Sequence, residues 1–74
     1  MTTPGQLRAA RALLGLSQAE VAALTGRGSK TIHRAETEGG PVAAETIASI
    51  RAALEAEGIE FTNGDAPGVR LRRG

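Results

Sequence analysis

The chain has 74 residues, no cysteine, one aromatic side chain (Phe61), and nine basic against eight acidic side chains. A chain of this length has room for one domain and none for a large internal substrate chamber. The lack of cysteine excludes disulfides and thiol chemistry, and His33 alone cannot assemble a histidine metal site. We therefore expect no enzyme activity, no cofactor or metal, and no small-molecule substrate.

The sequence predicts no membrane segment and no export signal. Its uncharged stretches are far shorter than the roughly 20 apolar residues that cross a bilayer. The opening residues 1–4 have neither a basic start nor an apolar core with a cleavage site behind it. We therefore predict a cytoplasmic protein. Fourteen of its apolar residues are alanine, which favours closely packed helices.

The net charge of +1 conceals a division along the chain. Residues 1–34 carry five basic groups and one acid, residues 35–68 carry one basic group and seven acids, and three arginines follow Val69. The three net charges are +4, −6 and +3. A polyanionic partner is therefore expected on the first part of the chain.

The first predicted helix covers residues 4–14. Thr3 and Gln6 have the spacing of a capping box, in which each side chain satisfies a backbone N–H of the first turn. Proline suits the first helical position, and Gly15 is a typical residue just past a helix end.

Two short helices are predicted next, over residues 18–25 and 29–38. Ser17 and Glu20 form a second capping box at the start of the first of them. Gly26 follows only nine residues after the cap and ends that helix. A tight turn therefore separates the two.

The longest predicted helix covers residues 43–57. After it, residues 59–72 alternate apolar with polar on either side of a run of turn formers, which predicts a β-hairpin. An isolated hairpin is only marginally stable in water. It must either fold back over its own helices or pair with a second copy, and the sequence leaves both open.

The segment LSQAEVAALTGRGSKTI, residues 16–32, with RALLG before it and RAE soon after it, resembles the helix-turn-helix of the Cro and phage-repressor-like (XRE) family. The likeness extends from about Leu7 to Leu54. It implies a mainly α, compact four-helix lambda-repressor-like helix-turn-helix domain in residues 1–58. The hairpin appendage in residues 59–74 replaces the family's usual fifth helix.

The resemblance implies sequence-specific DNA binding by a bacterial or phage transcriptional regulator. In a helix-turn-helix the first helix packs behind the second, which projects its outer face. If Ile32 points inward, Lys30 and Arg34 point outward, with Ser29 and His33 beside them. This face therefore carries two permanent cations.

Lys30 and Arg34 are the first choices for reading bases, because lysine and arginine donate to guanine O6 and N7 in the major groove. Family members commonly use a residue placed like Gln18 to grip a phosphate or brace a base-contacting side chain. A single exposed histidine such as His33 is more often a bystander than a switch. The predicted DNA-binding residues are Gln18, Arg27, Ser29, Lys30, Thr31, His33 and Arg34.

Other residues are expected to serve the structure. The resemblance implies a salt bridge between Arg11 and Glu36. Gly28 stands where a serine or threonine usually caps the recognition helix, which weakens that cap by a few tenths of a kcal/mol. The predicted structural residues are Ser17, Glu20, Gly26, Ile32, Arg11 and Glu36.

We expect double-stranded DNA as the partner and a homodimer formed through residues 59–72. Two-fold symmetry would match half-sites about 34 Å apart. The alternative is a protein-interaction module, such as an antitoxin or adaptor, that uses the same fold to hold a protein.

Overall fold

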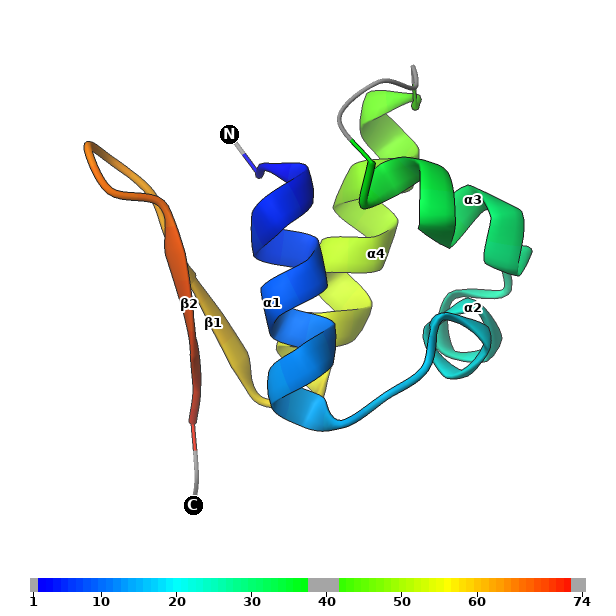
Figure 1. Cartoon of the computed structure of the whole chain (residues 1–74), viewed down its shortest axis with the longest axis horizontal. Coiled ribbons are helices and arrows are strands. Elements are labelled where there is room, and N and C mark those ends of the chain that lie inside the picture. The colour runs from blue at the N-terminus through cyan, green and yellow to red at the C-terminus, as the bar shows by residue number, and fades with distance from the viewer. Residues whose placement is uncertain (1, 38–41, 73–74) are drawn as a thin grey trace.

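Helices form most of the chain. The computed structural model describes residues 2–37 and 42–72. Within these residues the molecule is compact, with extents of 30 × 26 × 18 Å, and mainly helical with one small antiparallel hairpin (Figure 1). The predicted class is therefore confirmed at this coarse level. The elements are α1 (Pro4–Leu14), α2 (Gln18–Thr25), α3 (Ser29–Ala35), α4 (Ala44–Ala56), β1 (Ile59–Thr62) and β2 (Gly68–Leu71).

Capping boxes start α1 and α2 where the sequence predicts them. At α1, the Gln6 N–H donates to Thr3 Oγ1 at 3.1 Å, and the Thr3 N–H donates to Gln6 Oε1 at 2.8 Å. Both helices end at a glycine, Gly15 and Gly26, whose φ of 70° lies in the left-handed region. Glycine adopts this conformation without the steric cost that a side chain brings.

Helix α3 ends at Ala35, so the predicted range of residues 29–38 is wrong at its C-terminal end. The Arg8 guanidinium donates to the backbone carbonyl of Glu36. The last carbonyls of a helix have no partner within it, and here a side chain of α1 satisfies the Glu36 carbonyl just past the end of α3. Residue 38, the last residue of the predicted range, lies outside the described residues. Helix α4 is one residue shorter at each end than the predicted range of residues 43–57.

The core gathers the large apolar side chains of the four helices. The largest fully buried side chains are Leu7, Val21, Ile32, Ile50 and Leu54. Helix α4 contacts both α1 and α2, and α2 contacts α3. The buried alanines, one on each of α1 and α3 among others, let the helices pack closely.

The hairpin folds back over its own helices, which is one of the two arrangements that the sequence leaves open. Ile59 and Phe61 of β1 are buried in the core, while β2 lies against α1 (Figure 1). The buried Gln6 amide donates to the carbonyls of Thr62 at 2.8 Å and Gly68 at 3.0 Å. These bonds join the first turn of α1 to both strands.

Candidate nucleic-acid interface

Helices α2 and α3 form a unit whose second helix presents one face to solvent. Three residues, 26–28, connect them. Figure 1 shows α2 nearly end-on and α3 lying across the view, so the two cross steeply. Val21 and Ile32 are buried on their inner sides. The outer face of α3 is therefore the part that another molecule can reach.

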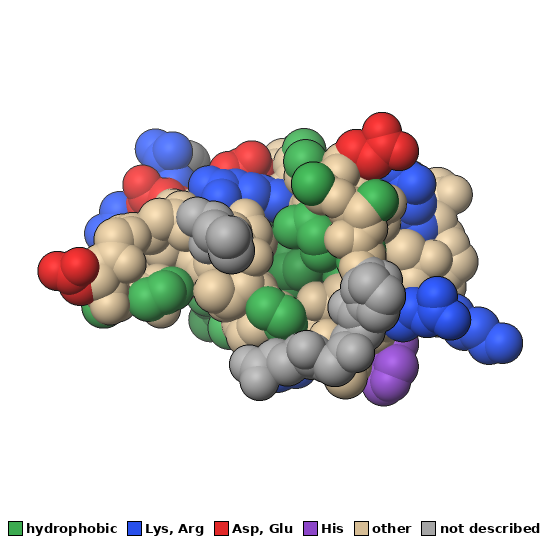
Figure 2. Space-filling view, turned by 90° about the horizontal axis from the view of Figure 1, so that it is seen from above, with side chains coloured by type: hydrophobic (Ala, Val, Ile, Leu, Met, Phe, Trp, Pro, Cys, Tyr) green, Lys and Arg blue, Asp and Glu red, His purple; other side chains and the backbone are tan. Residues whose placement is uncertain are grey.

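The outer face of α3 is polar and basic. Ser29, Lys30, His33 and Arg34 are exposed there, and Thr31 is half-buried. The side chains of Lys30 and Arg34 have no hydrogen bond or ion pair with any other residue in the described part of the chain. We call Ser29, Lys30, His33 and Arg34 the α3 face. Figure 2 shows basic side chains and the histidine together at one end of the molecule.

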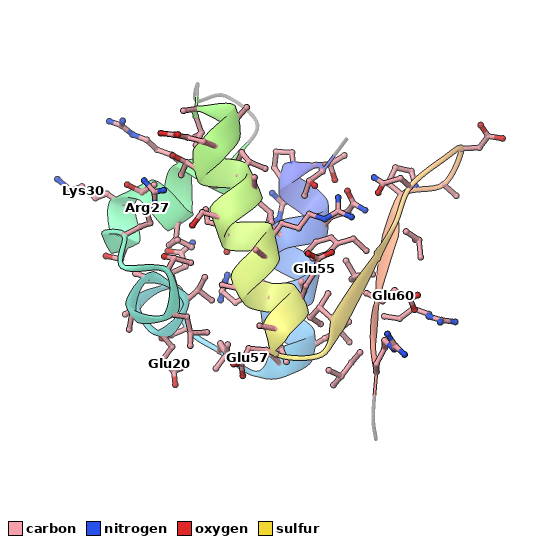
Figure 3. All side chains as sticks on the ribbon, turned by 180° about the vertical axis from the view of Figure 1, so that it is seen from behind. Glu20, Arg27, Lys30, Glu55, Glu57 and Glu60 are labelled. Atoms are coloured by element: carbon pink, nitrogen blue, oxygen red, sulfur yellow. The ribbon has the colours of Figure 1, made fainter. Side chains whose placement is uncertain are left out.

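Arg27 extends the basic region beyond α3. It is exposed in the connection after α2, and Figure 3 shows it close to Lys30 at one end of the molecule. In the same view Glu20, Glu57 and Glu60 lie well away from these two cations. The basic end is therefore not neutralised by these three acids.

A buried carboxylate holds the unit to α1. Glu36 is 4% exposed, and its Oε2 and Oε1 accept from Nε and Nη2 of Arg11 at 2.8 and 2.9 Å. Nη1 of Arg11 also donates to the Leu16 carbonyl at 3.0 Å. The hydrogen bond to Glu36 raises the pKa of the Arg11 guanidinium. The salt bridge implied by the family resemblance is thus present, and it fixes the end of α3 against α1.

Gln18 lies where α2 begins beside α3, and its amide is already engaged. Nε2 donates to Oε1 of Glu36 at 3.2 Å and lies 3.5 Å from Nδ1 of His33. The family resemblance implies that Gln18 grips a phosphate or braces a base-contacting side chain, but it does not identify His33 as the side chain that Gln18 contacts. That contact joins side chains 15 residues apart on different helices, so helical periodicity within α3 could not reveal it.

The predicted capping residues occupy the positions expected of them. Oε1 of Glu20 accepts from the Ser17 N–H at 2.8 Å, and the Glu20 N–H donates to Ser17 Oγ at 3.0 Å. The bond from the Ser17 N–H, with a smaller contribution from the hydroxyl, lowers the pKa of Glu20. Gly28 caps α3 without a side-chain hydrogen bond, as expected of glycine.

Arg8 has a structural role that sequence reasoning missed. The sequence marks Arg8 only as one of the five basic residues in its first part, whereas its guanidinium donates to the Glu36 carbonyl. Arg8 and Arg11 are three residues apart and therefore share one face of α1. Since Arg11 was already expected to reach Glu36, this spacing could have revealed the second contact.

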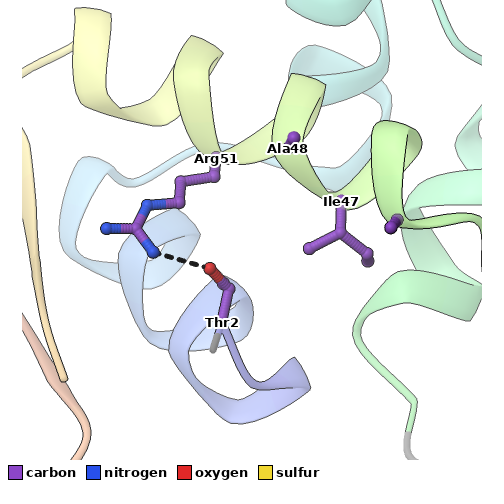
Figure 4. Close-up of a pocket in the computed structure, with 5 residues that line it drawn as sticks. Thr2, Ile47, Ala48 and Arg51 are labelled. Carbon is purple, nitrogen blue, oxygen red and sulfur yellow. Dashed lines mark hydrogen bonds between the residues drawn. The ribbon is translucent and has the colours of Figure 1, made fainter. Parts of the chain in front are cut away.

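An open cavity of about 500 Å³ lies between the start of α1 and α4 (Figure 4). Its lining is mostly apolar, and its one charged side chain, Arg51, donates to Thr2 Oγ1 at 2.8 Å. The Arg51 guanidinium also lies 4.8 Å from the centre of the Phe61 ring. The cavity therefore lacks the converging polar groups of a catalytic site. Its lining residues are Thr2, Ala44, Ile47, Ala48 and Arg51.

In residues 2–37 and 42–72, no group of three or more His, Asp or Glu side chains could hold a metal ion. None of the helices in these ranges has the length and apolar character needed to cross a membrane. Comparison with protein-family models finds no family that matches the chain, and a search of the curated proteins finds no match.

Proposed function

We infer that this protein is a sequence-specific DNA-binding protein that regulates transcription in the cytoplasm. The observation that carries this inference is the α3 face. Lys30 and Arg34 are exposed on it without partners among the described residues, on a helix that the Glu36–Arg11 salt bridge joins to α1. The resemblance of residues 16–32 to the helix-turn-helix of the Cro and phage-repressor-like family supports a lambda-repressor-like fold and the same use of this face.

The proposed mechanism is occupancy of a DNA site without chemistry. The major groove is about 12 Å wide and admits one helix, here α3. Lys30 and Arg34 donate to guanine edges, and Ser29 contacts a neighbouring base. Arg27 and Thr31 fix the register on phosphates, which carry no sequence information themselves. Repression or activation then follows from where the site lies relative to a promoter.

We also propose that two copies bind together, because one short helix covers only a few base pairs. The free edge of β2 supports this. The Arg72 N–H donates to the Gly58 carbonyl at 2.7 Å. In an antiparallel pair, residues bonded to the partner strand alternate with residues whose N–H and C=O groups point away from it. Val69 and Leu71 are of the second kind, so these groups point away from β1. An unpaired edge of this kind is a template for a second copy.

Two double variants with the same loss of charge test the DNA proposal. Lys30→Ala/Arg34→Ala and Arg70→Ala/Arg72→Ala each remove two positive charges, from the α3 face and from the hairpin respectively. A site is first selected from random DNA, and affinity is then measured by fluorescence anisotropy. Each guanine contact is worth about 1–3 kcal/mol, so the first variant should lose about 100-fold in affinity for the selected site. The second should keep its preference for that site over scrambled DNA.

Undiminished binding by a folded Lys30→Ala/Arg34→Ala protein would refute the assignment of the α3 face. Circular dichroism checks that both variants keep the helical content of the original. Salt dependence separates DNA binding from the alternative of a protein-interaction module. Affinity for DNA falls steeply with salt in proportion to the phosphates contacted, whereas an apolar protein contact is almost insensitive to it.

A further inference from the structure

The outer edge of β2 carries backbone groups that can serve a second copy of the chain. Val69 and Leu71 alternate with the residues that bond to β1, so each directs one N–H and one C=O away from the hairpin. In the described part of the chain the sheet consists of β1 and β2, so no other strand pairs with this edge. One copy therefore offers two donors and two acceptors along β2.

Symmetry and the positions of these groups determine the register of such a pair. Outward groups of two identical antiparallel strands face each other only if the two-fold axis passes beside a residue of the strand. With the axis at Val69, Leu71 faces Pro67, which has no N–H to donate to its carbonyl. With the axis at Leu71, Val69 faces residue 73, past the last residue of β2. With the axis at Arg70, Val69 faces Leu71 of the second copy, and both residues use their N–H and their C=O.

The same register continues the apolar face of the hairpin. Ile59 and Phe61 of β1 are buried, whereas their cross-strand neighbours Leu71 and Val69 are only half-buried. Residues opposite each other in an antiparallel pair lie on the same face of the sheet. Val69 and Leu71 of the second copy therefore extend this face and cover part of the side-chain surface that a single copy leaves exposed.

Arg70 lies on the other face of the hairpin, and in this register it lies opposite its own equivalent. Like charges directly opposite each other destabilise a strand pair. Here Nε of Arg70 donates to Oε1 of Glu60 at 2.9 Å. Each arginine is therefore accompanied by a carboxylate of its own copy, and the charges at the axis cancel.

The helices under the hairpin are a second, independent reason for this partner. β2 lies against α1 and β1 lies against α4. Figures 1 and 3 agree, since α1 and β2 are in front in the first view and α4 and β1 in the second. The helix nearer the free edge is therefore α1. A two-fold axis perpendicular to the sheet keeps the helices of both copies on one face, so the two α1 helices become neighbours.

Leu13 is the large apolar side chain that this neighbour covers. It follows Gln6 by seven residues, which is nearly two full helical turns, so both point to the same side of α1. Gln6 binds both strands from that side, yet Leu13 is 47% exposed. An exposed leucine beside an unpaired strand edge is typical of an interface between two copies, which is more apolar than the rest of a protein surface.

We propose that a second copy of this chain adds its β2 antiparallel to β2, with the two Arg70 residues facing each other across the two-fold axis. The result is a four-stranded sheet covered on one face by both α1 helices, with the two Leu13 side chains in the interface. This inference rests on the proposed pairing of two copies and specifies its register and its contacts.

Single cysteines report this register, because the chain has no cysteine of its own. Opposite residues in a non-hydrogen-bonded pair have Cα atoms about 4.5 Å apart, within the range of a disulfide. We expect Arg70→Cys to form a disulfide-linked dimer almost completely in oxidised glutathione, as measured on a non-reducing gel. Arg72→Cys is the matched control, since it removes the same charge from an exposed position but faces Gly68 of the second copy. It should stay unlinked.

Val69→Cys and Leu71→Cys report the two other registers. With the axis at Arg70, each lies diagonally from its equivalent, about 7–8 Å away, which is too far for a disulfide. If either links more completely than Arg70→Cys, the proposed register is wrong. If Arg70→Cys and Arg72→Cys link to the same extent, or if neither links while the unmodified protein is a dimer, the edge of β2 is not the interface.

The contact between the two α1 helices has its own pair of variants. Leu13 and Leu24 are both 47% exposed, and only Leu13 lies on α1. Burying the remaining surface of two leucines stabilises a dimer enough that Leu13→Gln should raise its dissociation constant about tenfold. Leu24→Gln should leave that constant unchanged in sedimentation experiments. If the two variants dimerise equally tightly, the α1 helices do not meet and the proposal is overturned.

Failure of this inference differs from failure of the proposed function. If the unmodified protein sediments as a monomer both alone and with a selected DNA site, the pairing of two copies is wrong and the register falls with it. DNA binding is tested separately by Lys30→Ala/Arg34→Ala. The disulfide-linked Arg70→Cys protein should bind the selected site at least as tightly as its reduced form. A loss of binding on linking would place the interface of the DNA-bound dimer elsewhere. Circular dichroism establishes that every variant is folded before its result is used.

Discussion

Glu36 is the single residue on which the geometry of the α3 face depends most. Its carboxylate accepts from Arg11 and Gln18, and its backbone carbonyl accepts from Arg8. One buried glutamate thus links α1, α2 and the end of α3. A charge that is 4% exposed is costly unless it is paired, so these contacts stabilise the fold only as a set.

Removing Arg11 should therefore destabilise the protein strongly. In Arg11→Met the Glu36 carboxylate stays buried without its cation, and we expect a loss of about 3 kcal/mol in the free energy of unfolding. Arg11→Met/Glu36→Gln should recover part of this loss, because a neutral amide is cheaper to bury. Urea unfolding of both variants and of Glu36→Gln measures the coupling. Equal stability of Arg11→Met and the unmodified protein would contradict this account.

At the scale of the elements, the helix ends that are marked by residues next to them were predictable, whereas the C-terminal end of α3 was not. The capping boxes at Thr3 and Ser17 and the glycines after α1 and α2 lie within or next to the helices that they bound. At the end of α3, by contrast, the Glu36 carbonyl accepts from Arg8, which is 28 residues away from it in the chain. The pattern within residues 29–38 does not contain that contact, and the predicted helix continued past the observed end at Ala35.

The cap of α2 makes an acid-dependent contribution to stability. The pKa of Glu20 is lowered in the folded protein, so the folded state binds its proton less readily than the unfolded chain. The contribution is complete above the usual glutamate pKa of 4.5 and is lost as pH falls through the lower folded value. In Glu20→Gln the side chain still accepts from the Ser17 N–H but does not titrate.

We expect the stability advantage of the unmodified protein over Glu20→Gln to grow as pH rises through this window and then to stay constant. Thermal unfolding of the two proteins at a series of pH values measures it. Other acids titrate in both proteins and cancel in the difference. If the stability difference between the two proteins is the same at every pH, the side-chain carbonyl at position 20, and not its charge, accounts for the stability of the cap.

At the scale of the molecule, helical periodicity placed the exposed face of α3 correctly but could not place side chains across two helices. Ile32 is buried, and Lys30 and Arg34 are exposed, as a turn of 100° per residue predicts. The engagement of Gln18 by Glu36 and His33 depends on how α2 and α3 pack. The packing of the hairpin on α1 was likewise one of two open arrangements.

The proposed dimer is best tested at the free edge of β2. Truncation after residue 58 would remove Ile59 and Phe61 from the core, whereas Val69→Pro removes an N–H that points away from β1. We expect this variant to stay folded and to sediment as a monomer at concentrations where the unmodified protein is a dimer. A folded Val69→Pro protein that remains dimeric would place the interface elsewhere. Arg70→Pro is the control, since its N–H faces β1 and its loss should destabilise the hairpin itself.

The bonds from Gln6 to Thr62 and Gly68 span 56 and 62 residues of sequence. The first turn of α1 therefore leaves the ribosome long before the strands that satisfy its buried amide. Closing so long a loop carries a large entropic cost, whereas forming a local helix does not require such a closure. Docking of the hairpin should thus be the last step of folding, and a nascent chain halted after α4 should expose the surface of α1 that the hairpin covers.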